Sequence, residues 1–172
     1  MGILDNLKTM IDQASSGNAS TTDVHAAFDE VTKSVSSGSL ADGLSHAFNS
    51  DKTPPFEQMV SGLFGQSNPD QKAGLLNKLL GSLPSGTTQA LAGVGGMAGL
   101  QALLNSKNVT PQQASQVPPQ AVESLAKQAA MKDPSIVDKA AGFYAQHPAL
   151  VKGIGVAALG LVMSRISQAR RA

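Results

Sequence analysis

The chain has 172 residues, of which 41% are hydrophobic and 15% are charged, and these proportions fit one or two small folded domains rather than a disordered chain. The absence of cysteine excludes a disulfide framework, a thiolate zinc site and a cysteine nucleophile. The net charge of +1 conceals an asymmetry: residues 1–83 carry nine acids and five bases, whereas residues 84–172 carry three acids and eight bases. We therefore expect any anionic partner to meet the second half of the chain.

The first residues, Met1 to Asn6, do not fit a targeting or lipidation signal. They lack the cationic start and the long apolar stretch of a secretory signal. Asn6 also stands where the myristoylation pattern requires Ser or Thr. We expect a cytoplasmic protein, with peripheral association at the membrane as a further expectation from the C-terminal segment described below.

Proline predicts where four helices begin, because its fixed φ suits the first helical turn and its missing N–H is not needed there. Each start is a pair of residues that ends in proline: Asn68-Pro69, Thr110-Pro111, Asp133-Pro134 and His147-Pro148. In the first three pairs, the residue before proline also has a side chain suited to capping a helix.

Apolar residues recur at intervals of three and four, which predicts amphipathic helices, and no alternating run predicts a strand. The stripes of the first half are Val24, Phe28, Val31 and Val35; Leu40, Leu44 and Phe48; Phe56, Met59, Val60, Leu63 and Phe64; and Leu75, Leu76, Leu79, Leu80 and Leu83. The stripes of the second half are Val122, Leu125, Ala126 and Ala129, followed by Ile136, Val137, Ala140, Phe143 and Tyr144. The prediction is an all-α, multi-helix bundle of about eight to nine short helices with a long apolar C-terminal helix.

A glycine-rich stretch, Gly93 to Gly99, interrupts the pattern between the two halves. Its four glycines would weaken a continuous helix by about 3 to 4 kcal/mol relative to alanine. Two interpretations remain open. The stretch is either a hinge between helical blocks, or a helix that packs closely through Gly93, Gly96 and Gly99.

The C-terminal segment from Pro148 to Ala172 combines an apolar run with positive charge and contains no acid. A single helix from Pro148 to Arg171 would be about 36 Å long. Its uninterrupted apolar part, Gly153 to Ser164, would be only about 18 Å long, which is short of the ~30 Å hydrocarbon core of a bilayer. A simple transmembrane span is therefore not expected.

Several roles for this segment remain open: a buried pillar of the helical core, a surface for lipid or a hydrophobic ligand, or a site for a partner helix or self-association. For contact with a ligand or lipid we single out Lys152, Ile154, Leu159, Leu161, Val162, Met163, Arg165, Arg170 and Arg171. Close helix packing would use the small residues Gly153, Ala157, Gly160 and Ser164, which share one helical face.

Motifs for catalysis, metals and cofactors are weak throughout the sequence. Glycine patterns that begin at Gly93 and Gly153 resemble a dinucleotide fingerprint, but neither follows a strand. The histidines, His25, His46 and His147, do not have the spacing of metal ligands, and no Gly-x-Ser-x-Gly elbow is present. We expect a non-enzymatic protein with no cofactor, no metal site and no catalytic residue.

The alternative is a helical nucleic-acid-binding protein that uses the basic second half. Short helices predicted over residues 110–117, 119–132 and 134–147 could form a helix-turn-helix arrangement. Nucleic acid is the less favoured partner because the bases of this region alternate with acids, which lowers the density of positive charge. These residues are Lys127, Lys132 and Lys139 among the bases, and Glu123, Asp133 and Asp138 among the acids.

Two stretches resemble the YidB-like proteins, a bacterial group of unassigned role. They are MGILDNL at the N-terminus and NVTPQQASQVPPQAVESLAKQAA from Asn108 to Ala130. In that family a turn, a short helix and a longer helix likewise follow a glycine-rich stretch. The resemblance implies a small helical bacterial protein without assigned catalysis, and it implies no functional residues.

The predicted organisation has four consecutive parts. These are an N-terminal helix and linker (1–19), a helical block (20–86), a glycine-rich connection or helix (87–109) and a second helical block that ends in the basic C-terminal helix (110–172). The predicted function is a non-enzymatic interaction protein that presents its apolar C-terminal helix to anionic lipid, a hydrophobic ligand or a partner helix.

Overall fold

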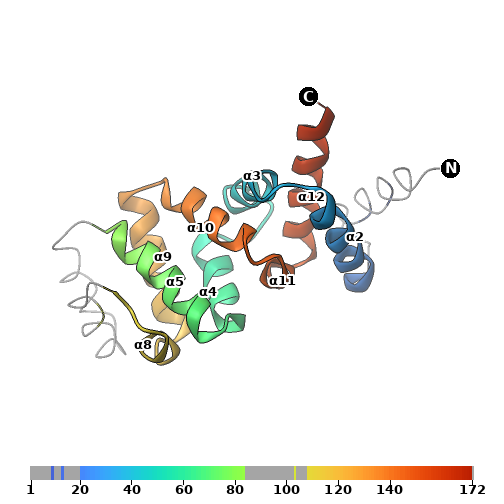
Figure 1. The fold of residues 1–172 in the computed structure, drawn as a ribbon. Coiled ribbons are helices and arrows are strands. Elements are labelled where there is room, and N and C mark those ends of the chain that lie inside the picture. Colours follow the sequence, from blue (N-terminus) through green and yellow to red (C-terminus); the bar gives the residue numbers. More distant parts are fainter. Residues whose placement is uncertain (1–8, 10–12, 14–19, 84–102, 104–107, 172) are drawn as a thin grey trace. The chain divides into compact units, whose positions relative to one another are not determined.

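A computed structural model describes residues 20–83 and 108–171, together with residues 9, 13 and 103 (Figure 1). Gly93 to Gly99 lies outside the described residues, as does most of the predicted N-terminal part. Across the described ranges the chain forms nine α-helices, one 3₁₀-helix and no strand, which confirms the predicted all-α fold. The helices are α2 (Thr21–Ser34), α3 (Ser37–Phe48), α4 (Phe56–Gln66), α5 (Pro69–Gly81), α8 (Pro111–Ser115), α9 (Pro119–Lys132), α10 (Ile136–Ala145), α11 (Pro148–Val151), η1 (Lys152–Ile154) and α12 (Val156–Arg171).

Local sequence signals explain several helix starts. Asn68 accepts a hydrogen bond from the Gln71 backbone N–H (2.9 Å), and the Gln71 side chain accepts one from the Asn68 N–H (3.0 Å), which completes a capping box before Pro69. Thr110 and Gln113 form the same arrangement at the start of α8. The predicted proline starts at Pro69 and Pro111 are therefore confirmed.

The chain divides into two compact units that do not follow the predicted consecutive blocks. Unit 1 comprises residues 1–55 and 141–172, and unit 2 comprises residues 56–140, so α10 crosses the boundary between them. The predicted block 20–86 is thus split after α3, and the C-terminal segment joins the first helices. The physical reason is that apolar faces pair by complementarity in space, whatever their separation along the chain.

Unit 1 is built around α12, which packs against α3 and α2 (Figure 1). Phe28 of α2 and Leu44 of α3 are fully buried, and so are Leu159 and Val162 of α12. The contact between α3 and α12 is very close at Gly43, because a Cβ placed there would lie 3.0 Å from Val162 Cγ1 and 3.0 Å from the Val162 carbonyl oxygen. The absence of a side chain at Gly43 is what permits this approach.

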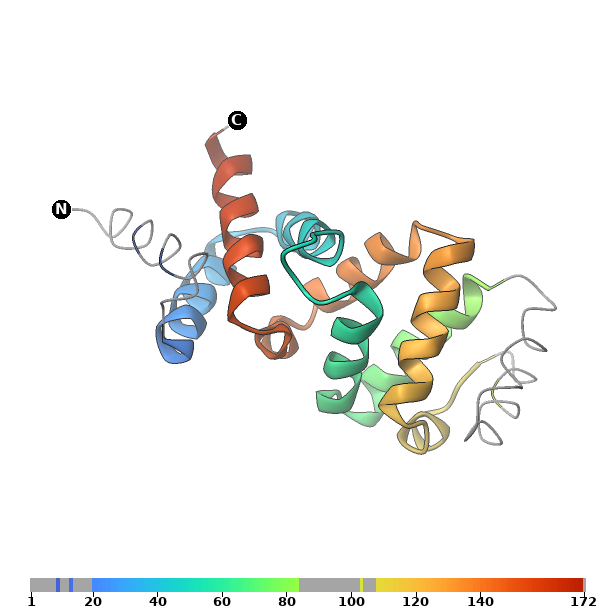
Figure 2. The same ribbon diagram turned by 180° about the vertical axis from the view of Figure 1, so that it is seen from behind.

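In unit 2, α4 lies along α9, and α5 packs against α8 and α9 (Figure 2). Two polar contacts fix this packing. The buried Ser61 hydroxyl donates to the Pro119 carbonyl oxygen (2.8 Å). The Asn77 side chain accepts from the Val109 N–H (2.7 Å) and donates to the Val109 carbonyl (3.3 Å), which holds the segment before α8 against α5.

The C-terminal segment is not the single helix predicted from Pro148 to Arg171. It forms the short α11, the 3₁₀ turn η1 and then α12, with the break at Gly155. Gly155 has a φ of 95°, a conformation that glycine adopts without steric cost and that ends a right-handed helix. The long helix is therefore α12 alone, whose 16 residues span about 24 Å.

Candidate functional site

Most of the apolar residues singled out on the C-terminal segment lie in the core. Leu159, Val162 and Met163 of α12 are at most 1% exposed, and Ile154 of η1 is also buried. Leu161 is half-buried and is the only member of that apolar set with substantial exposure. Four of these five side chains are therefore removed from water in this structure, and their contact with a ligand stays a prediction.

The predicted small-residue face does not act as one packing surface in the described part of the chain. Gly153 and Ala157 are exposed, Ser164 is half-buried, and Gly160 is buried. The reason is the break at Gly155, which places Gly153 outside α12 and so interrupts the face. The close helix contact of unit 1 instead relies on Gly43 of α3.

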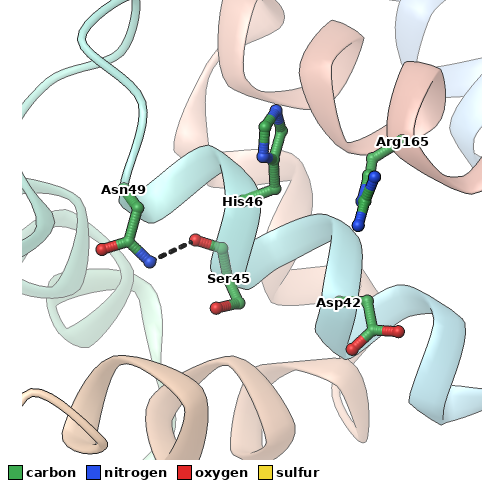
Figure 3. Close-up of a pocket in the computed structure, with 5 residues that line it drawn as sticks. All are labelled: Asp42, Ser45, His46, Asn49 and Arg165. Atoms are coloured by element: carbon green, nitrogen blue, oxygen red, sulfur yellow. Dashed lines mark hydrogen bonds between the residues drawn. The ribbon is translucent and has the colours of Figure 1, made fainter.

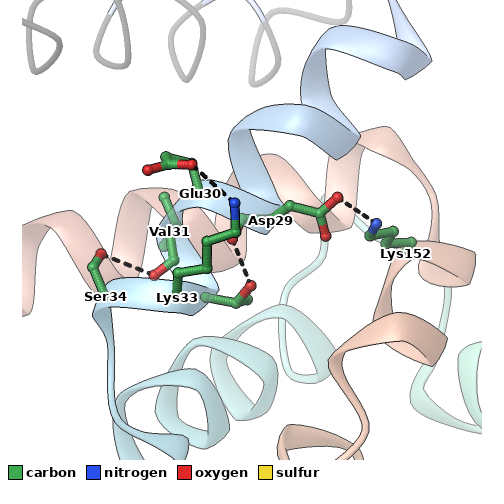
Figure 4. A network of polar contacts seen from close by, with 7 residues as sticks. Asp29, Glu30, Val31, Lys33, Ser34 and Lys152 are labelled. Carbon is green, nitrogen blue, oxygen red and sulfur yellow. Dashed lines mark hydrogen bonds and ion pairs between the residues drawn. The ribbon is translucent and has the colours of Figure 1, made fainter.

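Lys152 is engaged in an ion pair within the protein. Its ammonium lies 2.6 Å from Asp29 Oδ2, and the two side chains are 29% and 48% exposed (Figure 4). This contact joins η1 to α2 across 123 positions of sequence. Because its charge is already balanced, Lys152 is a poorer anion contact than the sequence predicts.

The remaining bases of α12 differ from Lys152. Arg165 is exposed, and within the described residues it makes no ion pair or hydrogen bond. Arg170 and Arg171 belong to the last turn of α12. The helix contains no acid, so its C-terminal end concentrates positive charge.

A polar pocket of about 360 Å³ lies between α3 and α12 (Figure 3). Its lining combines one base, one acid, an imidazole, a hydroxyl and an amide. Figure 3 shows the Arg165 side chain extending from α12 toward α3, where the four other residues lie. The lining residues are Asp42, Ser45, His46, Asn49 and Arg165.

The α3 residues of this pocket share a face because they are spaced at i, i+3, i+4 and i+7. Asn49 Nδ2 donates a hydrogen bond to the Ser45 backbone carbonyl (2.9 Å), which fixes the amide at the end of the helix. Asp42 and His46 are exposed, and neither makes a hydrogen bond or ion pair in the described part of the chain. Their polar atoms are therefore open to a ligand.

Sequence reasoning missed the α3 half of this pocket. The spacing of Asp42, Ser45, His46 and Asn49 opposite the apolar stripe was a usable signal for one polar face. Nothing in the sequence placed Arg165, more than a hundred positions later, beside it. Only the packing of α12 on α3 brings the two together.

The bases considered for nucleic-acid binding lie in unit 2 and are only partly available. Lys127 and Lys132 are exposed on α9. Lys139 instead forms an ion pair, in which its Nζ lies 2.8 Å from Asp133 Oδ2. This pairing lowers the positive charge that the region offers to a phosphate backbone.

The described residues can also be compared with the requirements of a metal site and of a membrane-spanning helix. Within the described ranges, no three His, Asp or Glu side chains gather in a way that could hold a metal ion. Over the same ranges, no helix is both long and apolar enough to cross a bilayer.

Comparison of the chain with family models, with curated proteins and with solved structures finds no match. The resemblance of MGILDNL and of Asn108 to Ala130 to the YidB-like proteins therefore stays a prediction. Functional inference for this chain rests on its own residues.

Proposed function

We propose that this protein is a non-enzymatic interaction module that binds an anionic surface, such as the headgroups of acidic phospholipids, through the cationic end of α12. The observation that carries the proposal is that the apolar and the basic residues of α12 have different surroundings. Its apolar stripe packs against α2 and α3, whereas Arg165 is exposed and Arg170 and Arg171 occupy the last turn with no acid between them.

This arrangement implies binding by charge rather than by insertion. A helix whose apolar face is buried in its own core has little hydrophobic surface left to place among acyl chains. Each base near an anionic membrane surface contributes about 1 kcal/mol, so three arginines contribute about 3 kcal/mol. Such binding is weak for a single molecule, and salt screens it.

The test is flotation of the full chain with vesicles of neutral phosphatidylcholine and with vesicles that also contain phosphatidylserine, at about 0.1 M and about 0.5 M salt. We expect flotation only with the anionic vesicles, and its loss at the higher salt. Flotation with neutral vesicles, or binding that salt does not weaken, would contradict an electrostatic mechanism.

A matched pair of variants locates the contact. The double substitution R170Q/R171Q removes two positive charges from α12 and should abolish most of the flotation. The substitution K127Q/K132Q removes two exposed charges from α9 in unit 2 and should leave flotation nearly unchanged. Equal losses in both variants would show that net charge alone is responsible, and would overturn the assignment to α12.

The same three proteins, the full chain and the two double variants, distinguish nucleic acid as the partner. Duplex DNA binding that K127Q/K132Q weakens, together with failure to float on any vesicle, would favour the helices of unit 2 as the binding surface. Absence of both activities would overturn the proposal of an anionic surface.

A further inference from the structure

We propose that the pocket between α3 and α12 binds a small zwitterion in which a phosphate ester is joined to a primary amine, with the phosphate against Arg165 and the ammonium against Asp42. The inference goes beyond the proposed function, because it concerns one discrete ligand and does not need Arg170 or Arg171. The volume of the pocket, about 360 Å³, lies within the usual range for a small-molecule site.

Three of the four groups that would bind this ligand are not used by the fold. Asp42, His46 and Arg165 are exposed and make no hydrogen bond or ion pair in the described ranges. This distinguishes Arg165 from Lys139 and Lys152, whose charges are paired with Asp133 and Asp29. The pocket therefore keeps one positive and one negative group available.

The positive side suits a phosphate. The Arg165 guanidinium presents a planar set of donors that matches two phosphate oxygens at once. His46 and the second N–H of Asn49 lie on the same pocket and can donate to the remaining oxygen. Figure 3 shows Arg165 extending from α12 toward α3, and Asn49 at the end of α3 with its amide turned toward the Ser45 carbonyl oxygen.

The negative side selects against a simple anion. A carboxylate on the rim repels phosphate, because like charges at short range raise the energy of the complex. A ligand that also carries an ammonium group converts this repulsion into attraction. Asp42 thus favours a phosphate joined to an amine over phosphate alone.

The experiment is a titration of the full chain followed by nuclear magnetic resonance, with O-phosphoethanolamine, inorganic phosphate and ethanolamine as separate probes. We expect O-phosphoethanolamine to shift the resonances of the five lining residues and to bind at least about fivefold more tightly than either fragment. Absence of shifts at these residues, or equal affinity for phosphate alone, would overturn the proposal.

Two substitutions on opposite sides of the pocket should have different signatures. R165Q should weaken O-phosphoethanolamine binding by about tenfold or more. D42N should weaken binding of the same probe but tighten binding of inorganic phosphate, because it removes the repulsion while keeping the shape. If D42N changes both affinities in the same direction, the role of Asp42 is wrong.

Matched controls make the same charge changes elsewhere. K127Q and D70N alter exposed residues of unit 2 and should leave both affinities unchanged. R170Q/R171Q should retain O-phosphoethanolamine binding even if it no longer floats with anionic vesicles, so the pocket and the proposed function can fail separately. If these controls lose probe binding as R165Q does, the effect is one of net charge and the pocket is not the site.

Vesicles distinguish the two sources of this chemistry. Flotation with phosphatidylethanolamine that D42N reduces would identify the ligand as a lipid headgroup. Binding of the soluble probe without such flotation would identify it as a free phosphate-bearing amine. Both results support the site. If R165Q keeps both flotation and binding of the soluble probe, the proposed site is wrong.

Discussion

Gly43 and Val162 lie so close that a methyl group on Gly43 would be 3.0 Å from both the Val162 side chain and the Val162 carbonyl oxygen. The contact joins the middle of α3 to the middle of α12 and defines how the two helices that form the pocket approach each other. One of the opposing atoms belongs to the backbone, which cannot rotate away.

We predict that G43A lowers the free energy of unfolding by about 1 to 2 kcal/mol, because α3 and α12 must move apart to accept the methyl group. The better helix propensity of alanine, worth up to about 1 kcal/mol, offsets part of a larger clash. Urea denaturation followed by circular dichroism measures the difference.

The matched control for this substitution is G62A on α4, where no atom of the described residues lies within 4 Å of the added Cβ, apart from neighbouring residues and the helix's own backbone. There the same change should raise the free energy of unfolding by about 0.5 to 1 kcal/mol, because only the backbone entropy term remains. If G43A stabilises the protein as much as G62A does, the close contact is not rigid.

Tyr144 gives a second prediction. Its side chain is fully buried, and within the described residues its hydroxyl has no hydrogen-bond partner. Burial raises the pKa of Tyr144 far above its ordinary value. The folded protein therefore holds the phenolic proton more tightly than the unfolded chain does.

This difference makes stability depend on pH in the alkaline range. The stabilisation of the folded state by protonated Tyr144 is fully present below the ordinary tyrosine pKa near 10 and is lost as the pH rises above it. Y144F should be as stable as the wild type at neutral pH, or more stable by up to about 1 kcal/mol, and should lose less stability above about pH 10.

The measurement is simple because Tyr144 is the only tyrosine and the chain has no tryptophan. Tyrosinate absorbance reports this one group, and urea unfolding of both proteins at neutral and alkaline pH reports its linkage to stability. Appearance of tyrosinate near pH 10 while circular dichroism remains native would contradict the assigned burial.

Asp133 gives a third prediction, at acid pH. Its carboxylate accepts hydrogen bonds from Lys139 Nζ (2.8 Å) and from the Ser135 hydroxyl (2.5 Å) at the turn before α10. The hydrogen bond from Lys139 is the main cause, and that from Ser135 the second, of a pKa of about 2 for Asp133. The lowered pKa means that the stabilisation by this carboxylate is present above its ordinary pKa of 3.8 and is lost as the pH falls toward 2.

We expect K139Q to raise the pKa of Asp133 toward 3.8, as measured from the carboxyl ¹³C resonance during acid titration. K132Q is the control, since Lys132 carries the same charge one residue from Asp133 but makes no hydrogen bond to it in the described structure. An equal shift in both variants would show that the general field of the lysines, and not the hydrogen bond, lowers the pKa.

The local features of this fold are readable from the sequence because their causes lie within a few residues. The stripe Phe56, Met59, Val60, Leu63 and Phe64 is buried throughout. Prediction was less accurate where a turn precedes a helix. Asp133 accepts from the Ser135 N–H (3.1 Å), and α10 begins at Ile136 rather than at Pro134.

Only the part of the pocket that α3 supplies could be predicted from the sequence. A polar face on α3 follows from the spacing of Asp42, Ser45, His46 and Asn49, but the choice of Arg165 as its fifth member depends on which helix covers α3. The apolar run of α12 likewise fits a core or a ligand surface equally well, since both environments favour the same side chains.

The sequence by itself determined the helices, their buried faces and the concentration of positive charge near the C-terminus, because propensity, capping and periodicity act over short separations. Only the tertiary structure decided that α12 packs on α3 and α2, that Gly155 breaks the C-terminal segment, and that Lys152 pairs with Asp29. The packing of α12 and the pairing of Lys152 with Asp29 depend on shape and charge complementarity between segments more than a hundred positions apart, and a stripe of apolar residues does not specify the stripe it will meet.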